Sequence, residues 1–189
     1  MRDRPRRDPR PAPEPPGPTQ AFEIATHFLA TRPRTRWEVG RRLARAGAAP
    51  DVAERTLDRL AELGLVDDAG FARWWHDQRD RHRPRGRRLI EAELRAKGVP
   101  ASVVELLRDA ERQRLEEDAG LPATEAERAA VALEGHLRGR PLPTDPRSLQ
   151  RIGMFLVRRG FDPAMARATI RAHAEESAAL HDIGPEEST

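Results

Sequence analysis

Apolar side chains along this chain recur every three to four residues and are interrupted by short segments rich in Gly and Pro. This spacing places apolar residues on one face of an α-helix, and the dominant residues Ala, Leu, Arg and Glu are good helix formers. Strand-forming residues do not alternate over any long stretch. The pattern predicts an all-α protein with nine helices, over residues 19–30, 35–46, 50–63, 68–82, 86–97, 100–117, 123–138, 146–159 and 162–179.

The nine predicted helices fall into three groups of three, because the second helix of each group ends in a similar way. Each ending has a Leu four residues before a Gly, basic residues near the last turn, and a Pro within three residues after the Gly. Such a Gly favours a left-handed cap, the cations complement the helix dipole, and the Pro suits the first turn of the next helix. The endings are Leu43–Gly47, Leu94–Gly98 and Leu156–Gly160, followed by Pro50, Pro100 and Pro163.

This repeat predicts an elongated array of three tandem three-helix repeats with helix-turn-helix-like units. Their expected limits are 19–66, 67–118 and 119–180. We expect the Arg- and Pro-rich residues 1–18 to form a disordered tail and the polar residues 181–189 to be flexible. Helices of 10–15 residues are marginal alone in water, so the three helices of each repeat must pack against one another.

Each repeat is expected to hold its own small core of eight or nine apolar side chains, each contributing about 1.5–3 kcal/mol. None of these sets is large enough for one big globular core. The predicted members are Phe22, Ala25, Phe28, Leu29, Trp37, Leu43, Leu57, Leu60 and Leu63 in the first repeat; Phe71, Trp74 or Trp75, Leu89, Ile90, Leu94, Val103, Val104 and Leu107 in the second; and Val131, Leu133, Leu149, Ile152, Phe155, Leu156, Met165 and Ile170 in the third.

Charge is unevenly distributed along the chain, whose formal net charge is +3 and whose only lysine is Lys97. Residues 67–98 hold nine basic and six acidic side chains, a sum of +3, and residues 99–143 hold six basic and nine acidic ones, a sum of −3. A basic middle followed by an acidic stretch favours a partner surface over uniform solvation. The chain has no cysteine and no apolar run long enough to span a bilayer, so we expect a cytoplasmic protein without membrane contact.

The densest basic run, residues 79–88, holds six arginines and one acid at a predicted joint between two helices. Such a joint presents guanidinium groups to phosphates or to a carboxylate-lined groove, and the alternative is a solvated turn. Trp37 and one of Trp74 and Trp75 are assigned to the core, and the other of that pair is interpreted as an exposed anchor. The candidate residues for binding a partner or DNA are Arg79, Arg81, Arg83, Arg85, Arg87, Arg88 and Trp75.

Motifs for catalysis or metal binding are missing from the sequence. It contains no HExxH, GxGxxG, Walker A motif or nucleophile elbow, and its histidines have no metal-ligand spacing. The adjacent Asp67 and Asp68 lack a third acid at useful spacing, so we interpret one of them as the cap of the following helix. We therefore expect no enzyme, no catalytic residue, no cofactor and no metal.

Four motifs, in order, resemble those of the RecX family. They are Thr35-Arg36-Trp37-Glu38-Val39-Gly40-Arg41-Arg42-Leu43, whose Thr35 and Glu38 form a predicted capping box; Gly64-Leu65-Val66-Asp67-Asp68-Ala69-Gly70-Phe71-Ala72; the segment Gly86 to Val99 with Ile90, Glu93, Leu94, Lys97 and Gly98; and Phe155-Leu156-Val157-Arg158-Arg159-Gly160-Phe161. The resemblance covers about residues 20–176. Thr35, Val39 and Val66 depart from the family pattern but keep the cap or the apolar character.

The resemblance implies a regulatory protein that binds the RecA filament on single-stranded DNA, lies in its helical groove and opposes filament growth, ATP hydrolysis and strand exchange. It would thereby limit homologous recombination and the SOS response to DNA damage. We expect a monomer that touches several subunits of the filament at once, with a possible weak direct contact to DNA. The main alternative is a helix-turn-helix-like DNA-binding regulator that acts without RecA. A third interpretation is a helical scaffold for an unrelated protein.

Overall fold

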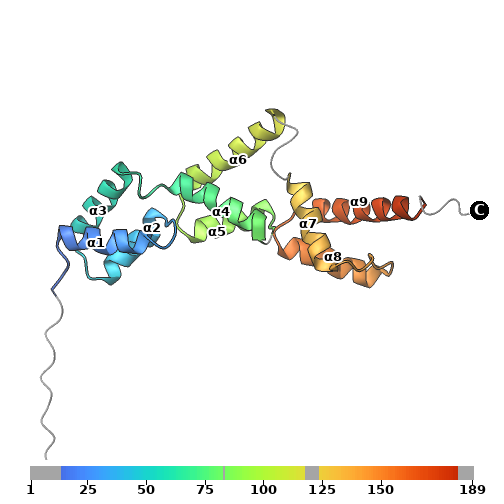
Figure 1. The fold of residues 1–189 in the computed structure, drawn as a ribbon, viewed down its shortest axis with the longest axis horizontal. Helices are drawn as coiled ribbons and strands as arrows, with labels where there is room; N and C mark the ends of the chain where they lie inside the picture. The colour runs from blue at the N-terminus through green and yellow to red at the C-terminus, as the bar shows by residue number, and fades with distance from the viewer. Residues whose placement is uncertain (1–13, 83, 118–123, 183–189) are drawn as a thin grey trace, which may run out of the picture. The chain divides into compact units, whose positions relative to one another are not determined.

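The computed structural model describes residues 14–82, 84–117 and 124–182, and within these residues the chain forms nine α-helices and no strand (Figure 1). All nine predicted helices are present, with limits within three residues of those predicted, so the all-α prediction is confirmed. The predicted tails fall mostly outside the described residues. The helices are α1 (Pro18–Leu29), α2 (Arg36–Arg45), α3 (Pro50–Glu62), α4 (Asp68–His82), α5 (Arg87–Ala96), α6 (Ala101–Glu117), α7 (Glu125–Leu137), α8 (Pro146–Arg158) and α9 (Pro163–Asp182).

The chain divides into two compact units, Met1–Asp67 and Asp68–Thr189. Helices α1–α3 of the first unit surround one apolar cluster that includes Leu43 and Leu60. The second unit holds two such clusters, one within α4–α6 around Phe71 and one within α7–α9 around Leu133. The predicted array of three-helix repeats with separate small cores is thus confirmed, and the exact residue limits of the repeats stay a prediction.

The three glycine endings have the same geometry, which explains why they recur in the sequence. Gly47, Gly98 and Gly160 have φ values of +83°, +76° and +90°, the left-handed region that favours glycine. The amide of the residue after each glycine donates to the carbonyl of the Leu five residues earlier, with N–O distances of 3.1, 3.1 and 3.2 Å. These bonds satisfy carbonyls that the helix end leaves unpaired. The Leu of each ending is fully buried, namely Leu43, Leu94 and Leu156.

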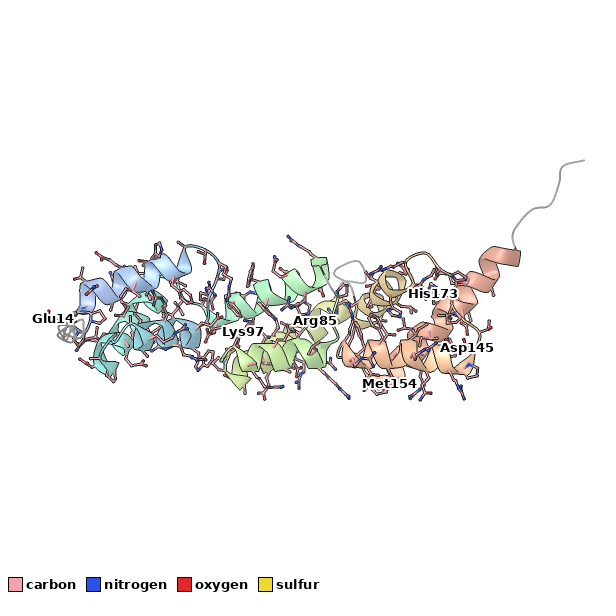
Figure 2. The ribbon with its side chains drawn as sticks, turned by 90° about the horizontal axis from the view of Figure 1, so that it is seen from below. Glu14, Arg85, Lys97, Asp145, Met154 and His173 are labelled. Carbon is pink, nitrogen blue, oxygen red and sulfur yellow. The ribbon has the colours of Figure 1, made fainter. Side chains whose placement is uncertain are left out.

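Side-chain caps fix where several helices begin. The predicted capping box of α2 is confirmed, because the Glu38 amide donates to the Thr35 hydroxyl at 3.1 Å and the Thr35 amide donates to the Glu38 carboxylate at 3.3 Å. The sequence analysis missed a second capping box, at the start of α7. Asp145, labelled in Figure 2, accepts from the Ser148 amide at the start of α8, and its hydrogen bonds with Ser148 lower the pKa of its carboxyl. Helix α4 begins at Asp68, so Asp67 is at the N-cap position.

Three predicted core residues are wrong, because Trp37, Leu63 and Val131 are 44%, 47% and 52% exposed. The buried stripe of α2 runs through Val39 and Leu43, and Trp37 is two residues, about 200°, away from Val39 around the helix. Leu63 follows the last turn of α3. Val131 is on the exposed side of α7, whose buried residues are Arg128, Ala129, Ala132, Leu133 and Leu137.

Buried positions that the sequence analysis missed follow the glycine endings. Val99 and Phe161 are 4% and 1% exposed, and each directly follows the glycine of its ending. An apolar residue at this position commonly packs against the preceding turn of the helix. None of the helices in the described ranges is long and apolar enough to cross a membrane.

Candidate functional site

The predicted basic run occupies the joint between α4, which ends at His82, and α5, which begins at Arg87. Arg83 lies outside the described residues. Arg85 precedes α5 and Lys97 follows it, as Figure 2 shows. The structure separates the other predicted residues into two groups, one that forms an internal network and one that stays at the surface.

The internal network gathers on the carboxylate of Glu93, which is only 17% exposed. Trp75 Nε1 and Arg79 Nε each donate to Glu93 Oε2 at 2.9 Å, and Arg85 forms an ion pair with Glu93 Oε1. Partial burial lowers the pKa of the Arg79 guanidinium, which still stays charged at neutral pH because arginine is too basic to lose its proton in a protein. Arg79 and Arg85 therefore have a structural partner within the same trio of helices.

Trp75 does not form the exposed anchor that the sequence predicted. It is half-buried and packs on the cluster of α4–α6, where its ring stacks on Phe71 with centroids 5.8 Å apart. The Arg79 guanidinium and the Lys97 ammonium lie 4.1 and 4.3 Å from the centroid of its ring. Trp74 is also half-buried in this cluster, so the expected division of the pair into one core and one exposed side chain is wrong. Both tryptophan rings pack beside the ring of Phe71.

Replacing Glu93 with glutamine is expected to lower the free energy of unfolding by about 1–3 kcal/mol. Glutamine keeps an acceptor for Trp75 but removes the charge that holds Arg79 and Arg85. Urea unfolding followed by tryptophan fluorescence measures the change. Glu134→Gln, at an exposed position of α7, is the control and should change stability by less than about 0.5 kcal/mol. Equal stabilities of the two variants would show that the Glu93 network is not structural.

The surface group consists of Arg81, Arg87 and Arg88, which are all exposed. The side chains of Arg87 and Arg88 are 51% and 68% exposed. Arg88 forms an ion pair with Asp162 at 2.8 Å, and Arg87 Nε is 4.0 Å from a Glu91 oxygen. The Arg88–Asp162 pair is exposed on both sides and therefore weak, and the Arg87–Glu91 pair is long, so both guanidinium groups can exchange a carboxylate of this chain for an anion of a partner.

Close backbone packing joins helices α4–α6 to helices α7–α9 at Gly86, which is buried. The Gly86 amide donates to the Arg159 carbonyl at 2.9 Å, and Arg159 Nη1 donates to the Pro84 carbonyl at 3.2 Å. A Cβ atom at Gly86 would overlap the backbone of Gly160, so only glycine fits there. We define these contacts as the glycine joint.

A buried polar cluster supports the same contact. Arg128 on α7 is 6% exposed, and its Nη1 is 3.4 Å from His76 Nε2 and 3.7 Å from Asp80 Oδ2. His76 Nδ1 is 3.3 Å from the same Asp80 oxygen. The Glu125 carboxylate at the start of α7 also accepts from the Arg87 amide at 3.1 Å. Helices α4, α5 and α7 are therefore held together by polar contacts as well as by the glycine joint.

The glycine joint brings together cations that the sequence analysis did not connect. Arg81 at the end of α4 lines a groove of about 590 Å³ with Arg138 and Arg140, which follow α7, and Arg159, which follows α8. These arginines are up to 78 positions apart in the sequence, so only the fold shows that they are neighbours. The sequence marks two of them: Arg81 belongs to the predicted basic run, and Arg159 directly precedes Gly160, the glycine of the third ending. Among the described residues no group of three or more His, Asp or Glu side chains could hold a metal ion.

Comparisons with known proteins place the chain among RecX proteins. Family models described as the first and second three-helix domains of RecX match residues 21–60 and 67–106. The chain is 35% identical over 161 residues to the regulatory protein RecX of Mycobacterium avium, covering 84% of this chain and 87% of that protein. It is 37% identical over 155 residues to that of Mycobacterium marinum, covering 81% and 84%.

Solved structures support the same fold. The crystal structure of RecX from Lactobacillus salivarius matches with a TM-score of 0.68 and 18% identity, covering 83% of this chain and 96% of that one. A second crystal structure, of a regulatory protein RecX, matches with a TM-score of 0.61 and 23% identity, covering 79% and 70%.

Proposed function

Because the chain belongs to the RecX family, we propose that it is a non-enzymatic regulatory protein that binds RecA filaments on single-stranded DNA and restrains them. Restraint here means slower filament growth, ATP hydrolysis and strand exchange. This role would limit homologous recombination and the SOS response in the cytoplasm. Weak contacts from several helical trios of one monomer would add up along a filament, whose surface repeats.

The observation that carries the proposal beyond family membership is the exposure of Arg87 and Arg88 at the start of α5. The exposed Arg88–Asp162 pair contributes little to stability, and Arg87 Nε is 4.0 Å from Glu91, so the folded protein can present both guanidinium groups to an anionic partner. Arg79 and Arg85 support this surface through Glu93 rather than by contact with the partner. Of the predicted basic run, only the exposed arginines are therefore proposed to contact the partner.

Replacing both Arg87 and Arg88 with glutamine is expected to weaken binding to RecA filaments about fivefold, because each exposed charge contributes about 0.5 kcal/mol. Fluorescence anisotropy of the labelled protein, titrated with RecA filaments on a dT oligonucleotide, measures the affinity. The matched control is Arg55→Gln/Arg59→Gln, two exposed arginines of α3 that also hold surface ion pairs. Equal losses in the two double variants would contradict a specific role for the start of α5.

The same titration separates the proposal from the helix-turn-helix alternative. A DNA-binding regulator would bind the oligonucleotide equally well without RecA, and six phosphate contacts would give a log–log salt slope of about −5. The proposal predicts that tight binding needs RecA. Indifference to both RecA and DNA would instead favour a scaffold for an unrelated protein.

A further inference from the structure

We propose that the groove between α4 and the α7–α8 pair binds an acidic peptide segment of the partner protein; this inference rests on the proposed function. The groove has a volume of about 590 Å³ and is lined by Arg81, Arg138, Arg140 and Arg159. These side chains come from the end of α4, the segment after α7 and the end of α8. Four guanidinium groups around one hollow form a site for carboxylates, which arginine binds with two parallel hydrogen bonds.

The positive charge of the groove is not cancelled from within. Asp80 is the one carboxylate among its lining residues. Its Oδ2 atom already lies 3.3 Å from His76 Nδ1 and 3.7 Å from the Nη1 atom of the buried Arg128. Arg128 thus compensates Asp80, and the four lining arginines keep their charge for a ligand.

Two of the lining arginines are available for binding. Arg81 and Arg138 are exposed, and neither forms an ion pair with any carboxylate of the described residues. Arg138 has a left-handed backbone, with φ +52°, and is the one non-glycine residue of positive φ in the described part of the chain. This conformation is uncommon for arginine, and such backbone outliers are concentrated at functional sites. Its amide donates to the Glu134 carbonyl at 2.8 Å, which holds the turn in place.

The apolar part of the lining favours a peptide over single-stranded DNA. The ring of Phe155 already stacks on His136, with centroids 4.1 Å apart, and the Arg159 guanidinium is 4.8 Å from its centroid. Single strands bind largely by stacking bases on free aromatic faces, and this ring already has two stacked partners. Val131, also in the lining, is 52% exposed and offers contact to an apolar side chain. The chemistry therefore fits acidic residues next to an apolar one.

The test compares two double variants of the full chain. Arg81→Gln/Arg138→Asn removes the two available charges, and asparagine tolerates the left-handed backbone. Arg147→Gln/Arg171→Gln removes two exposed charges of α8 and α9 outside the groove lining and is the matched control. Anisotropy titrations with RecA filaments on a dT oligonucleotide should show about tenfold weaker binding for the groove variant and little change for the control. Affinity for the oligonucleotide alone should be the same for all three proteins.

Equal filament affinities of the groove variant and the control would overturn the inference. A loss of affinity for the bare oligonucleotide that matches the loss for filaments would assign the groove to DNA phosphates instead. If the unmodified chain fails to bind filaments at all, the proposed function fails. In that case, NMR titration of the isotope-labelled chain with a Glu- and Leu-containing peptide tests whether the groove binds an acidic peptide, independently of RecA. Shifts at Arg81, Val131 and His136 would support an acidic-peptide site, and no shifts there would overturn it.

Discussion

Replacing Leu94 with alanine is expected to lower the free energy of unfolding of the second unit by about 2–5 kcal/mol. Leu94 is fully buried and belongs to the cluster that holds α4, α5 and α6 together. Its carbonyl also accepts the Val99 amide that closes the glycine ending of α5. Alanine would leave a cavity among Phe71, Ile90 and Val104, and a core this small has few other side chains to fill it.

Chemical denaturation followed by circular dichroism measures the loss at Leu94. Leu106→Ala provides a matched control, because Leu106 belongs to the same trio but is 68% exposed. The control should cost less than about 1 kcal/mol. A Leu94 variant as stable as the Leu106 variant would show that the α4–α6 cluster does not hold this trio together.

Replacing Gly86 with alanine is expected to lower the free energy of unfolding by about 3 kcal/mol and to open the contact between α4–α6 and α7–α9. The added methyl group would overlap backbone atoms of Gly160 and Phe161, which cannot rotate away as a side chain can. The hydrogen bond from the Gly86 amide to Arg159, at 2.9 Å, would be lost with the contact. Limited proteolysis should then cut between the two trios faster than in the unmodified chain.

Gly135→Ala is the control for the glycine joint. Gly135 lies inside α7, and nothing is within 4 Å of the position of an added Cβ atom. Alanine there should stabilise the helix by about 0.5–1 kcal/mol. The same replacement of glycine by alanine is therefore expected to lower the free energy of unfolding at Gly86 and to raise it at Gly135. A Gly86 variant that gains stability would contradict the close packing at the joint.

The helices and their order could be predicted from the sequence because the signals for them are local. Apolar spacing, the glycine endings and the Thr35–Glu38 capping box each act within one or two helical turns. These signals also carried the family resemblance. The core assignment of Leu43, Leu94 and Leu156 was correct for the same reason, since each occupies the same position relative to its glycine.

Features that depend on contacts between distant segments could not be predicted. Trp37 was assigned to the core from its size, but its position on α2 turns it away from the buried stripe. The basic run looked like one surface, whereas Glu93 holds Arg79 and Arg85 in an internal network. The groove arginines come from three elements that only the glycine joint brings together. Local patterns contain no information on such pairings.

We propose that this chain acts by restraining the RecA filament and performs no chemistry itself. Titration of the purified chain into RecA hydrolysing ATP on single-stranded DNA tests this claim most directly. The claim predicts a rate of ATP hydrolysis that falls with added protein and levels off at saturation. A rate that stays constant up to a large molar excess of the chain over RecA would contradict it.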